Sequence, residues 1–437
     1  MRRLLMDKLV SWKTNPNRKP LLLRGARQTG KTWLMEEFAA QEFQDSIKID
    51  FMFDEQARTL FEQDLDPKRI IRQIELRQGR AITPSKTLLI FDEIQEVPRG
   101  ITSLKYFCEQ AREYHVIAAG SYMGVALRRN EESFPVGKVD QLTLRPLCFS
   151  EFVRATAGEP LADALEAAST EDLVATADML ERLLKEYLIV GGMPEIVEAY
   201  RSKKDAAEAR RLQLGILESY DADFSKHAPE RILERMRLVW KSLPGQLARE
   251  NKKFVYGTVR PGARARDFEE SLQWLADYGA VSKVPRAGAL HTPLLGYEDV
   301  SAFKLFSIDV GLLGAQAGLD PAVVLDGSRL FTEFKGAMTE QYVEQELRCL
   351  GYEPAYWSAE KGTAETDFCI PFGGTVLPIE VKAGENLRAK SLRVACEKFK
   401  LDTALRTSLS PYRHDGWLVN VPLWAIGQFE KLMSRES

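Results

Sequence analysis

The sequence is poor in the residues that form disulfide frameworks and zinc sites. Its 437 residues include five cysteines and four histidines, and no two cysteines stand at CxxC spacing. Disulfides persist mainly in oxidising compartments, and structural zinc sites need closely spaced Cys and His ligands. We therefore expect a protein without disulfides or zinc that works in the reducing cytoplasm.

Long apolar runs are lacking as well. No uninterrupted apolar run approaches the ~20 residues of a membrane-spanning helix. Asp7 and Lys8 interrupt the apolar residues near the start of the chain, where a signal peptide would have its apolar core. The formal net charge is −3, so any contact with nucleic acid needs a local basic patch. We expect no membrane partner.

The chain instead contains short apolar runs that alternate with amphipathic segments. Over residues 1–155 the runs are "LLLRG", "SIKIDF", "TLLIFDE" and "YHVIAAGS". Short runs that are apolar on both faces are typical of buried parallel strands, and their alternation with helices predicts an α/β fold with a parallel sheet. Residues 156–230 are rich in Ala, Glu and Leu and predict a helical subdomain, in which one long helix stops at Gly191 and Gly192.

A phosphate-binding loop follows the first of these runs. Gly25-Ala26-Arg27-Gln28-Thr29-Gly30-Lys31-Thr32 matches G-x-x-x-x-G-K-[ST] at every fixed position. Glycines allow the loop to curl so that backbone N–H groups and a helix N-terminus face phosphate oxygens. Lys31 would reach the β- and γ-phosphates, and the Thr32 hydroxyl would bind Mg²⁺. The predicted cofactors are ATP and Mg²⁺.

The second half of such a site is an apolar strand that ends in acidic residues. Residues 88–91 are apolar, and Asp92 and Glu93 follow directly. Asp92 would hold Mg²⁺, largely through water, and Glu93 would polarise the attacking water. Ser121, at the end of the next strand, would orient that water. The alternatives are that Glu93 caps the next helix and that Ser121 serves a plain turn.

These motifs, in this order, resemble those of an AAA+ ATPase. More narrowly, "FPVGKVDQLTLRPLCFSEF" and "YLIVGGMPEIVEAY" resemble a prokaryotic AAA+ family that carries a C-terminal domain of unknown function related to PD-(D/E)XK nucleases. The resemblance implies four domains: an ATPase core at 1–155, a lid-like helical subdomain at 156–230, a winged-helix-like domain at 231–330 and a restriction-endonuclease-like α/β domain at 331–437.

AAA+ enzymes usually take an arginine from a neighbouring subunit, which stabilises charge in the transition state. A homo-oligomer is therefore one expectation, and the sequence does not distinguish a hexamer, a dimer and a monomer. Arg128, Arg129, Arg145 and Lys138 lie in the right part of the chain, and no spacing rule selects one of them.

The middle of the chain is locally basic. Residues 231–286 contain twelve Lys and Arg residues and six Asp and Glu residues. Phe268, Leu272, Leu275 and Tyr278 recur at helical spacing, and a strand and turn follow, which suits a winged helix. Three arginines at the start of that helix would contact DNA phosphates: Arg260, Arg264 and Arg266. A solvated basic face and a contact between subunits are the alternatives.

The last part of the chain places acidic residues on predicted strands. Glu380 and Lys382 alternate along one strand and so share a face, Asp367 lies on the preceding strand, and Glu340 lies on a helix before them. Glu340, Asp367 and Glu380 would bind Mg²⁺, and Lys382 would help to activate water. The pattern resembles PD-(D/E)XK, although Glu365-Thr366 stands where the proline is expected.

The sequence thus predicts a cytoplasmic ATPase that binds and hydrolyses Mg²⁺-ATP and acts on DNA. Its C-terminal domain would supply metal-dependent cleavage or binding through Asp367, Glu380 and Lys382. The alternative is a nucleotide-dependent switch or scaffold that binds a protein partner. Its nuclease-like domain would then be inactive, with Glu380 and Lys382 forming an ordinary salt bridge.

Overall fold

The chain forms two compact units. The computed structural model describes residues 1–121, 134–249, 252–322, 332–360, 362–384 and 389–434. The N-terminal unit consists of Arg2–Arg145 with Asp277–Gly279, and the C-terminal unit comprises Pro146–Ala276 and Ala280–Ser437, with Met1. Among the residues that the structure describes, none of the helices combines the length and the apolar character that a membrane span requires.

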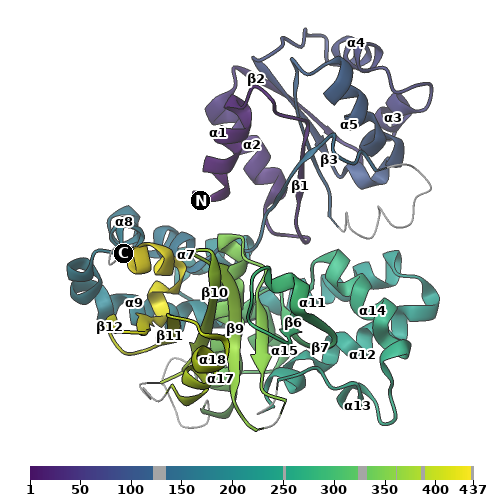
Figure 1. Cartoon of the computed structure of the whole chain (residues 1–437). Coiled ribbons are helices and arrows are strands. Elements are labelled where there is room, and N and C mark those ends of the chain that lie inside the picture. The colour runs from purple at the N-terminus through teal and green to yellow at the C-terminus, as the bar shows by residue number, and fades with distance from the viewer. Residues whose placement is uncertain (122–133, 250–251, 323–331, 361, 385–388, 435–437) are drawn as a thin grey trace. The chain divides into compact units, whose positions relative to one another are not determined.

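A five-stranded parallel sheet forms the centre of the N-terminal unit (Figure 1). Its order is β2 (Asp45–Asp50), β3 (Thr87–Asp92), β4 (His115–Ala119), β1 (Leu21–Arg24) and β5 (Asp140–Thr143). The four apolar runs predicted as strands are β1 to β4, so that prediction is confirmed. The edge strand β5 lacks the apolar run of the others, since its residues alternate between half-buried and exposed.

Helices cover both faces of this sheet, because its side chains point alternately to either side. Leu21 and Leu23 pack with α1 (Leu5–Thr14) and α2 (Lys31–Glu42). Leu22 points the other way and packs with α4 (Pro67–Gln78) and α5 (Pro98–Gln110). The described residues of the unit also form three short elements: α3 (Glu55–Arg58), η1 (Thr59–Phe61) and η2 (Ile94–Glu96).

The C-terminal unit begins with helices. They are α7 (Phe149–Ala157), α8 (Glu159–Ala167), α9 (Thr170–Val190), α10 (Pro194–Lys203) and α11 (Ala206–His227). The prediction of a helical segment is confirmed, and the face of α9 that carries Leu180, Leu183 and Leu184 is buried. As predicted, α9 ends at Gly191, whose φ is 73°.

The Gly191-Gly192 turn lies against two other segments of the same unit. A Cβ atom on Gly191 would lie 2.1 Å from Asp309 Oδ1, and one on Gly192 would lie 2.1 Å from the carbonyl oxygen of Leu147. The Gly192 N–H donates to Asp309 Oδ2 at 2.6 Å, and the Leu147 N–H donates to the Gly192 carbonyl at 2.7 Å. The two glycines thus allow a close approach of backbones that no larger residue permits.

Replacing Gly192 by alanine should therefore destabilise the C-terminal unit. The new methyl group would displace the backbone at Leu147, and overpacking of this kind costs about 1–3 kcal/mol. Gly215→Ala is the matched control: it lies in α11 with open space around it, and alanine there should be neutral or slightly stabilising. Thermal unfolding of the two variants checks this, and equal melting temperatures would contradict it.

The C-terminal unit also contains an eight-stranded sheet, in the order β12-β13-β11-β10-β9-β8-β6-β7. Helices α12 (Glu230–Leu247), α13 (Tyr256–Val259) and α14 (Ala265–Tyr278) precede the antiparallel pair β6 (Val281–Ala287) and β7 (Glu298–Ser307), which η3 (Leu294–Tyr297) connects. The expected helix followed by a β-hairpin is thus present.

The hairpin extends the sheet formed by the last part of the chain. Strand β6 pairs in parallel with β8 (Ala355–Ser358), with Arg286 opposite Tyr356. The predicted strands β8, β9 (Glu365–Phe372) and β10 (Thr375–Val381) are confirmed. The remaining elements are α15 (Val310–Gln316), α17 (Thr332–Leu350), α18 (Lys390–Phe399), β11 (Ala404–Ser408), β12 (Arg413–Asp415), β13 (Leu418–Pro422), η5 (Leu423–Gln428) and α19 (Phe429–Ser434). Residues predicted to form separate domains on either side of position 330 therefore share one sheet.

Candidate functional site

The predicted phosphate loop connects the end of β1 to the start of α2. Gly25 has φ 153°, and a Cβ atom there would lie 2.4 Å from the carbonyl oxygen of Leu144, just after β5. Gln28 and Gly30 have left-handed backbone conformations, with φ 65° and 90°. These conformations curl the loop, which therefore ends at the N-terminus of α2, where free N–H groups favour an anion.

Lys31 places its ammonium group inside this curl. Its Nζ donates to the carbonyl oxygens of Gly25 at 3.0 Å and Ala26 at 2.8 Å, and to Ser121 Oγ at 3.3 Å. Thr29 supports the same loop, since its hydroxyl donates to the Ala26 carbonyl at 2.9 Å. Burial lowers the pKa of Lys31 to about 8, against the opposing charges of Glu93 and Asp92. A buried ammonium group that is short of negative charge is a strong partner for phosphate.

Thr32 and Asp92 lie in direct contact, although β1 and β3 are separated by β4 in the sheet. The Thr32 hydroxyl donates to Asp92 Oδ2 at 2.7 Å. Asp92 is the last residue of β3 and is 2% exposed, and burial raises the pKa of its carboxyl. The two residues predicted to share Mg²⁺ thus offer a hydroxyl and a carboxylate at one point, which are oxygen ligands of the kind that Mg²⁺ prefers.

Glu93 follows at the same edge of the sheet. Its Oε2 accepts hydrogen bonds from Gln95 Nε2 at 2.6 Å and from the backbone N–H of Ser121 at 3.4 Å. Its side chain makes no capping hydrogen bond to η2, which is the next helical element. The structure therefore brings Lys31, Thr32, Asp92, Glu93 and Ser121 together.

Sequence reasoning missed Arg3, whose side chain forms a hydrogen bond with the phosphate loop. Arg3 is 4% exposed, and its guanidinium donates to the carbonyl oxygens of Thr29 at 3.2 Å and Arg145 at 2.6 Å. It therefore connects the phosphate loop to Arg145, where the segment Arg2–Arg145 of the N-terminal unit ends. No motif marks it. The one available signal is its position as a basic residue shortly before the amphipathic segment that forms α1.

Replacing Arg3 by methionine should raise the KM for ATP about tenfold, with a smaller change in kcat. The loop would lose a charge-assisted hydrogen bond, which contributes about 1.5–3 kcal/mol. Steady-state kinetics on Arg3→Met, on Arg3→Lys as a partial rescue and on the exposed neighbour Arg2→Met as a control check this. An unchanged KM combined with a lower melting temperature would show that Arg3 only stabilises the fold.

Of the four candidates for a residue that acts between subunits, the structure describes Lys138 and Arg145. Arg128 and Arg129 lie outside the described residues. Lys138 forms an ion pair with Glu109, with Nζ 2.8 Å from Oε1. The backbone carbonyl oxygen of Arg145 accepts a hydrogen bond from the guanidinium of Arg3.

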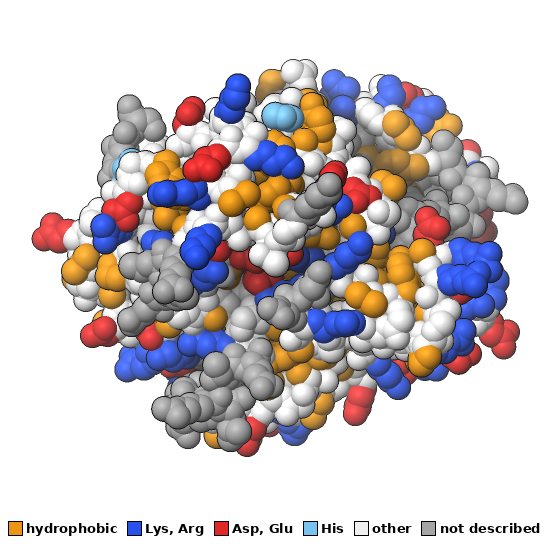
Figure 2. Space-filling view, turned by 60° about the horizontal axis from the view of Figure 1, so that its bottom comes forward, with side chains coloured by type: hydrophobic (Ala, Val, Ile, Leu, Met, Phe, Trp, Pro, Cys, Tyr) orange, Lys and Arg blue, Asp and Glu red, His pale blue; other side chains and the backbone are white. Residues whose placement is uncertain are grey.

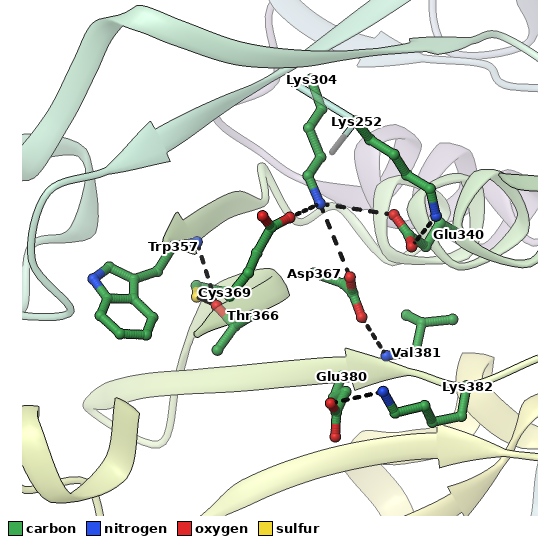
Figure 3. Close-up of polar contacts among 11 residues, drawn as sticks. Lys252, Lys304, Glu340, Trp357, Thr366, Asp367, Cys369, Glu380, Val381 and Lys382 are labelled. Atoms are coloured by element: carbon green, nitrogen blue, oxygen red, sulfur yellow. Dashed lines mark hydrogen bonds and ion pairs between the residues drawn. The ribbon is translucent and has the colours of Figure 1, made fainter. Parts of the chain in front are cut away.

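Two of the predicted acidic residues of the C-terminal unit, Glu340 and Asp367, lie in a cluster of charges around a buried lysine (Figure 3). Lys304 of β7 is 1% exposed, and its Nζ lies 2.6 Å from Glu365 Oε1, 3.7 Å from Glu340 Oε2 and 3.9 Å from Asp367 Oδ1. Lys252 pairs with the other oxygen of Glu340. We refer to Lys252, Lys304, Glu340, Glu365 and Asp367 as the lysine-carboxylate cluster.

Burial and nearby charges shift the pKa values of Glu340 and Asp367 in opposite directions. Burial, with the nearby charge of Glu340, raises the pKa of Asp367 to about 7. Burial would also raise the pKa of Glu340, but the charges of Lys304 and Lys252 outweigh it and hold that pKa below its usual value. The backbone N–H of Val381 donates to Asp367 Oδ2 at 2.7 Å, so both oxygens of Asp367 already face positive groups.

Glu380 and Lys382 form a separate pair, with Nζ 2.9 Å from Oε1 (Figure 3). The predicted magnesium ligands Glu340, Asp367 and Glu380 do not fit a metal ion as their side chains lie. Within the part of the chain that the structure describes, no group of three or more His, Cys, Asp or Glu side chains could hold one. The structure brings Glu340 and Asp367 together, and it fills the space beside them with Lys304, which sequence reasoning missed.

The predicted DNA-contacting arginines lie on the surface. Arg260, Arg264 and Arg266 are exposed and stand just before and within the first turn of α14. Arg266 Nε lies 3.9 Å from Asp267 Oδ1, which is a weak, exposed pair. The face drawn in Figure 2 carries its Lys and Arg side chains in several separate groups.

Comparison with known families assigns the N-terminal unit to a class. Residues 17–153 match a family model described as an AAA domain. This part of the chain is an AAA-type ATPase domain: an α/β, P-loop, nucleotide-binding ATPase fold. Residues 181–323 and 335–425 match two further models, each described as a domain of unknown function (DUF8612 and DUF4143).

Several solved structures are similar to the chain at low identity. A Walker-type ATPase of Pyrococcus abyssi is 14% identical, with 72% of this chain and 95% of that chain covered and a TM-score of 0.43. The ORC2 protein of Aeropyrum pernix in its ADPNP–ADP complexes is 12% identical, with 77% and 91% covered and a TM-score of 0.33. The ORC1 protein of the same organism in complex with DNA is 14% identical, with 73% and 91% covered and a TM-score of 0.26.

With TM-scores below 0.5, these likenesses carry no conclusion about function. No curated protein matches the chain.

Proposed function

We propose that the N-terminal unit binds ATP with Mg²⁺ in the loop 25–32 and hydrolyses it. The observation that carries the proposal is the 2.7 Å hydrogen bond between Thr32 and Asp92, because it unites the phosphate loop with the acidic end of β3. The match of residues 17–153 to an AAA domain supports the same conclusion.

Each residue of the site has a role that its chemistry suits. Lys31 moves its N–H groups from the loop carbonyls to the β- and γ-phosphates. Thr32 and Asp92 hold Mg²⁺, which neutralises phosphate charge when bound. Glu93 accepts the proton of the attacking water, and Ser121 orients that water. The hydrogen bonds from Ser121 N–H and Gln95 fix the Glu93 carboxylate in place for this step.

Phosphate release from ATP tests this function. The purified full-length protein should release phosphate with Mg²⁺ and stop when EDTA removes the metal. A protein that neither binds ATP in calorimetry nor releases phosphate, with or without DNA, would contradict the proposal.

We propose further that the C-terminal unit contacts DNA phosphates through Arg260, Arg264 and Arg266, and that the ATPase works as a homo-oligomer. Three exposed guanidinium groups at the start of α14, which precedes the β6–β7 hairpin, support the DNA contact. The competing function is a nucleotide-dependent switch whose C-terminal unit binds a protein partner.

Replacing these three arginines by alanine should weaken DNA binding and flatten its salt dependence. Each lost phosphate contact lowers the slope of log K against log salt by about 0.9. Fluorescence anisotropy with duplex DNA at several salt concentrations checks this. Replacing three exposed arginines of the helical segment (Arg182, Arg201 and Arg211) by alanine is the matched control. Equal affinity and slope in both variants, or no DNA binding by the wild type, would favour the protein-partner function.

A further inference from the structure

Lys304 enters the lysine-carboxylate cluster from a part of the chain outside the predicted nuclease-like domain. It lies on β7, whereas Glu340 lies on α17 and both Glu365 and Asp367 lie on β9 (Figure 3). Its side chain is 1% exposed, so the ammonium group has almost no direct contact with solvent. A buried ammonium is tolerated only where carboxylates compensate its charge.

The lysines compensate most of the negative charge of the cluster, and a formal charge of −1 is left when all three carboxyl groups are ionised. Two lysines, Lys304 and Lys252, face three carboxyl groups, and each of Glu340, Glu365 and Asp367 lies within 4.0 Å of an ammonium nitrogen. A divalent cation placed among these carboxylates would add two positive charges beside Lys304. If the cation displaced Lys304 instead, it would leave a buried ammonium group without partners. Either change is unfavourable.

We propose that Lys304, supported by Lys252, is the resident cation of this centre and does the charge neutralisation that a metal ion would do in a metal-dependent nuclease. The centre joins β7, α17 and β9 without a metal. The C-terminal unit accordingly contributes binding rather than metal-dependent cleavage. This inference is independent of the ATPase assignment, because every residue in it belongs to the C-terminal unit.

Metal-dependent unfolding of a Lys304→Met variant tests the proposal. Removing the ammonium leaves Glu340 and Asp367 buried without their shared partner, which should lower the melting temperature in EDTA by about 10 °C. Mn²⁺ should restore much of this loss, since it binds the folded state at the vacated position. Wild type, without nucleotide, should show no such gain with Mn²⁺.

Two controls make the result specific. Lys241→Met, which changes an exposed lysine of the same unit, should behave as wild type. Lys304→Met combined with Asp367→Asn should lose the recovery with Mn²⁺, because one of the freed carboxylates is gone.

Calorimetric titration of Mn²⁺ into the nucleotide-free wild type decides the matter even if Lys304→Met does not fold. Wild type and Asp367→Asn should give the same titration. Binding by the wild type that Asp367→Asn abolishes would overturn the proposal, and so would a Lys304→Met variant with wild-type stability in EDTA. Mg²⁺-dependent nicking of plasmid DNA that stops in Asp367→Asn would overturn it as well.

Discussion

Replacing Glu93 by glutamine should leave ATP binding intact and slow hydrolysis by about 10²–10⁴-fold, the contribution typical of a general base. The amide keeps the shape of the carboxylate and one oxygen that can accept from the Ser121 N–H, so the site should keep its geometry. It cannot take a proton from water. Single-turnover phosphate release measures the chemical step, and calorimetry with ATP measures binding.

The control for this variant is Glu113→Gln, which changes an exposed carboxylate of the same unit. It should hydrolyse ATP at the wild-type rate. If Glu93→Gln also turned over at the wild-type rate, Glu93 would not be the base.

Replacing Lys31 by alanine should abolish measurable ATP binding. Its ammonium group lies inside the loop, and we expect it to make at least two charge-assisted hydrogen bonds to bound phosphates. At about 1.5–3 kcal/mol each, their loss corresponds to about 10²–10⁴-fold in Kd. Lys68→Ala, at an exposed position of α4, is the matched control and should bind ATP normally.

The Lys31 variant should fold as well as the wild type. Burial lowers the pKa of Lys31 to about 8, below the value of about 10.5 expected in the unfolded chain. The folded protein therefore disfavours the charged lysine at pH 7, and the unliganded fold loses little when it is removed. Lost binding together with an unchanged melting temperature would assign the effect to the site. Retained micromolar binding would refute the role of Lys31.

Local patterns were enough to place the predicted residues of the N-terminal site near one another, because the strands and the loop that position them come from short segments. Leu21, Leu22 and Leu23 specify a strand buried on both faces, and the glycines after them allow only a tight curl. Asp92 could be placed opposite Thr32 because the carboxyl ends of parallel strands meet at one edge. The role of Glu93 stays a prediction, although the structure removes its alternative as a helix cap.

Interactions between distant segments could not be read from the sequence. Arg3 has no motif, and its partners Thr29 and Arg145 are known only once β1 and β5 are neighbours. Strand β5 itself was not marked by an apolar run, because its residues alternate between half-buried and exposed positions.

The acidic residues of the C-terminal unit are a second case in which the sequence did not reveal a contact between distant segments. Strand periodicity correctly placed Asp367 and Glu380 on neighbouring strands, β9 and β10. It could not reveal that Lys304, from a hairpin expected to belong to another domain, is buried among the carboxylates. A pattern of acidic residues thus predicts a negative centre, but the identity of its cation depends on the tertiary fold.

The central claim is that one site binds the triphosphate through Lys31 and the metal ion through Thr32 and Asp92. Calorimetric titration of a slowly hydrolysed ATP analogue into the wild type and Asp92→Asn, each with Mg²⁺ and with EDTA, tests it most directly. The account predicts that Mg²⁺ tightens binding to the wild type and that Asp92→Asn loses most of this gain. Equal affinity of the wild type with Mg²⁺ and with EDTA, or an Asp92→Asn variant that responds to Mg²⁺ as the wild type does, would contradict it.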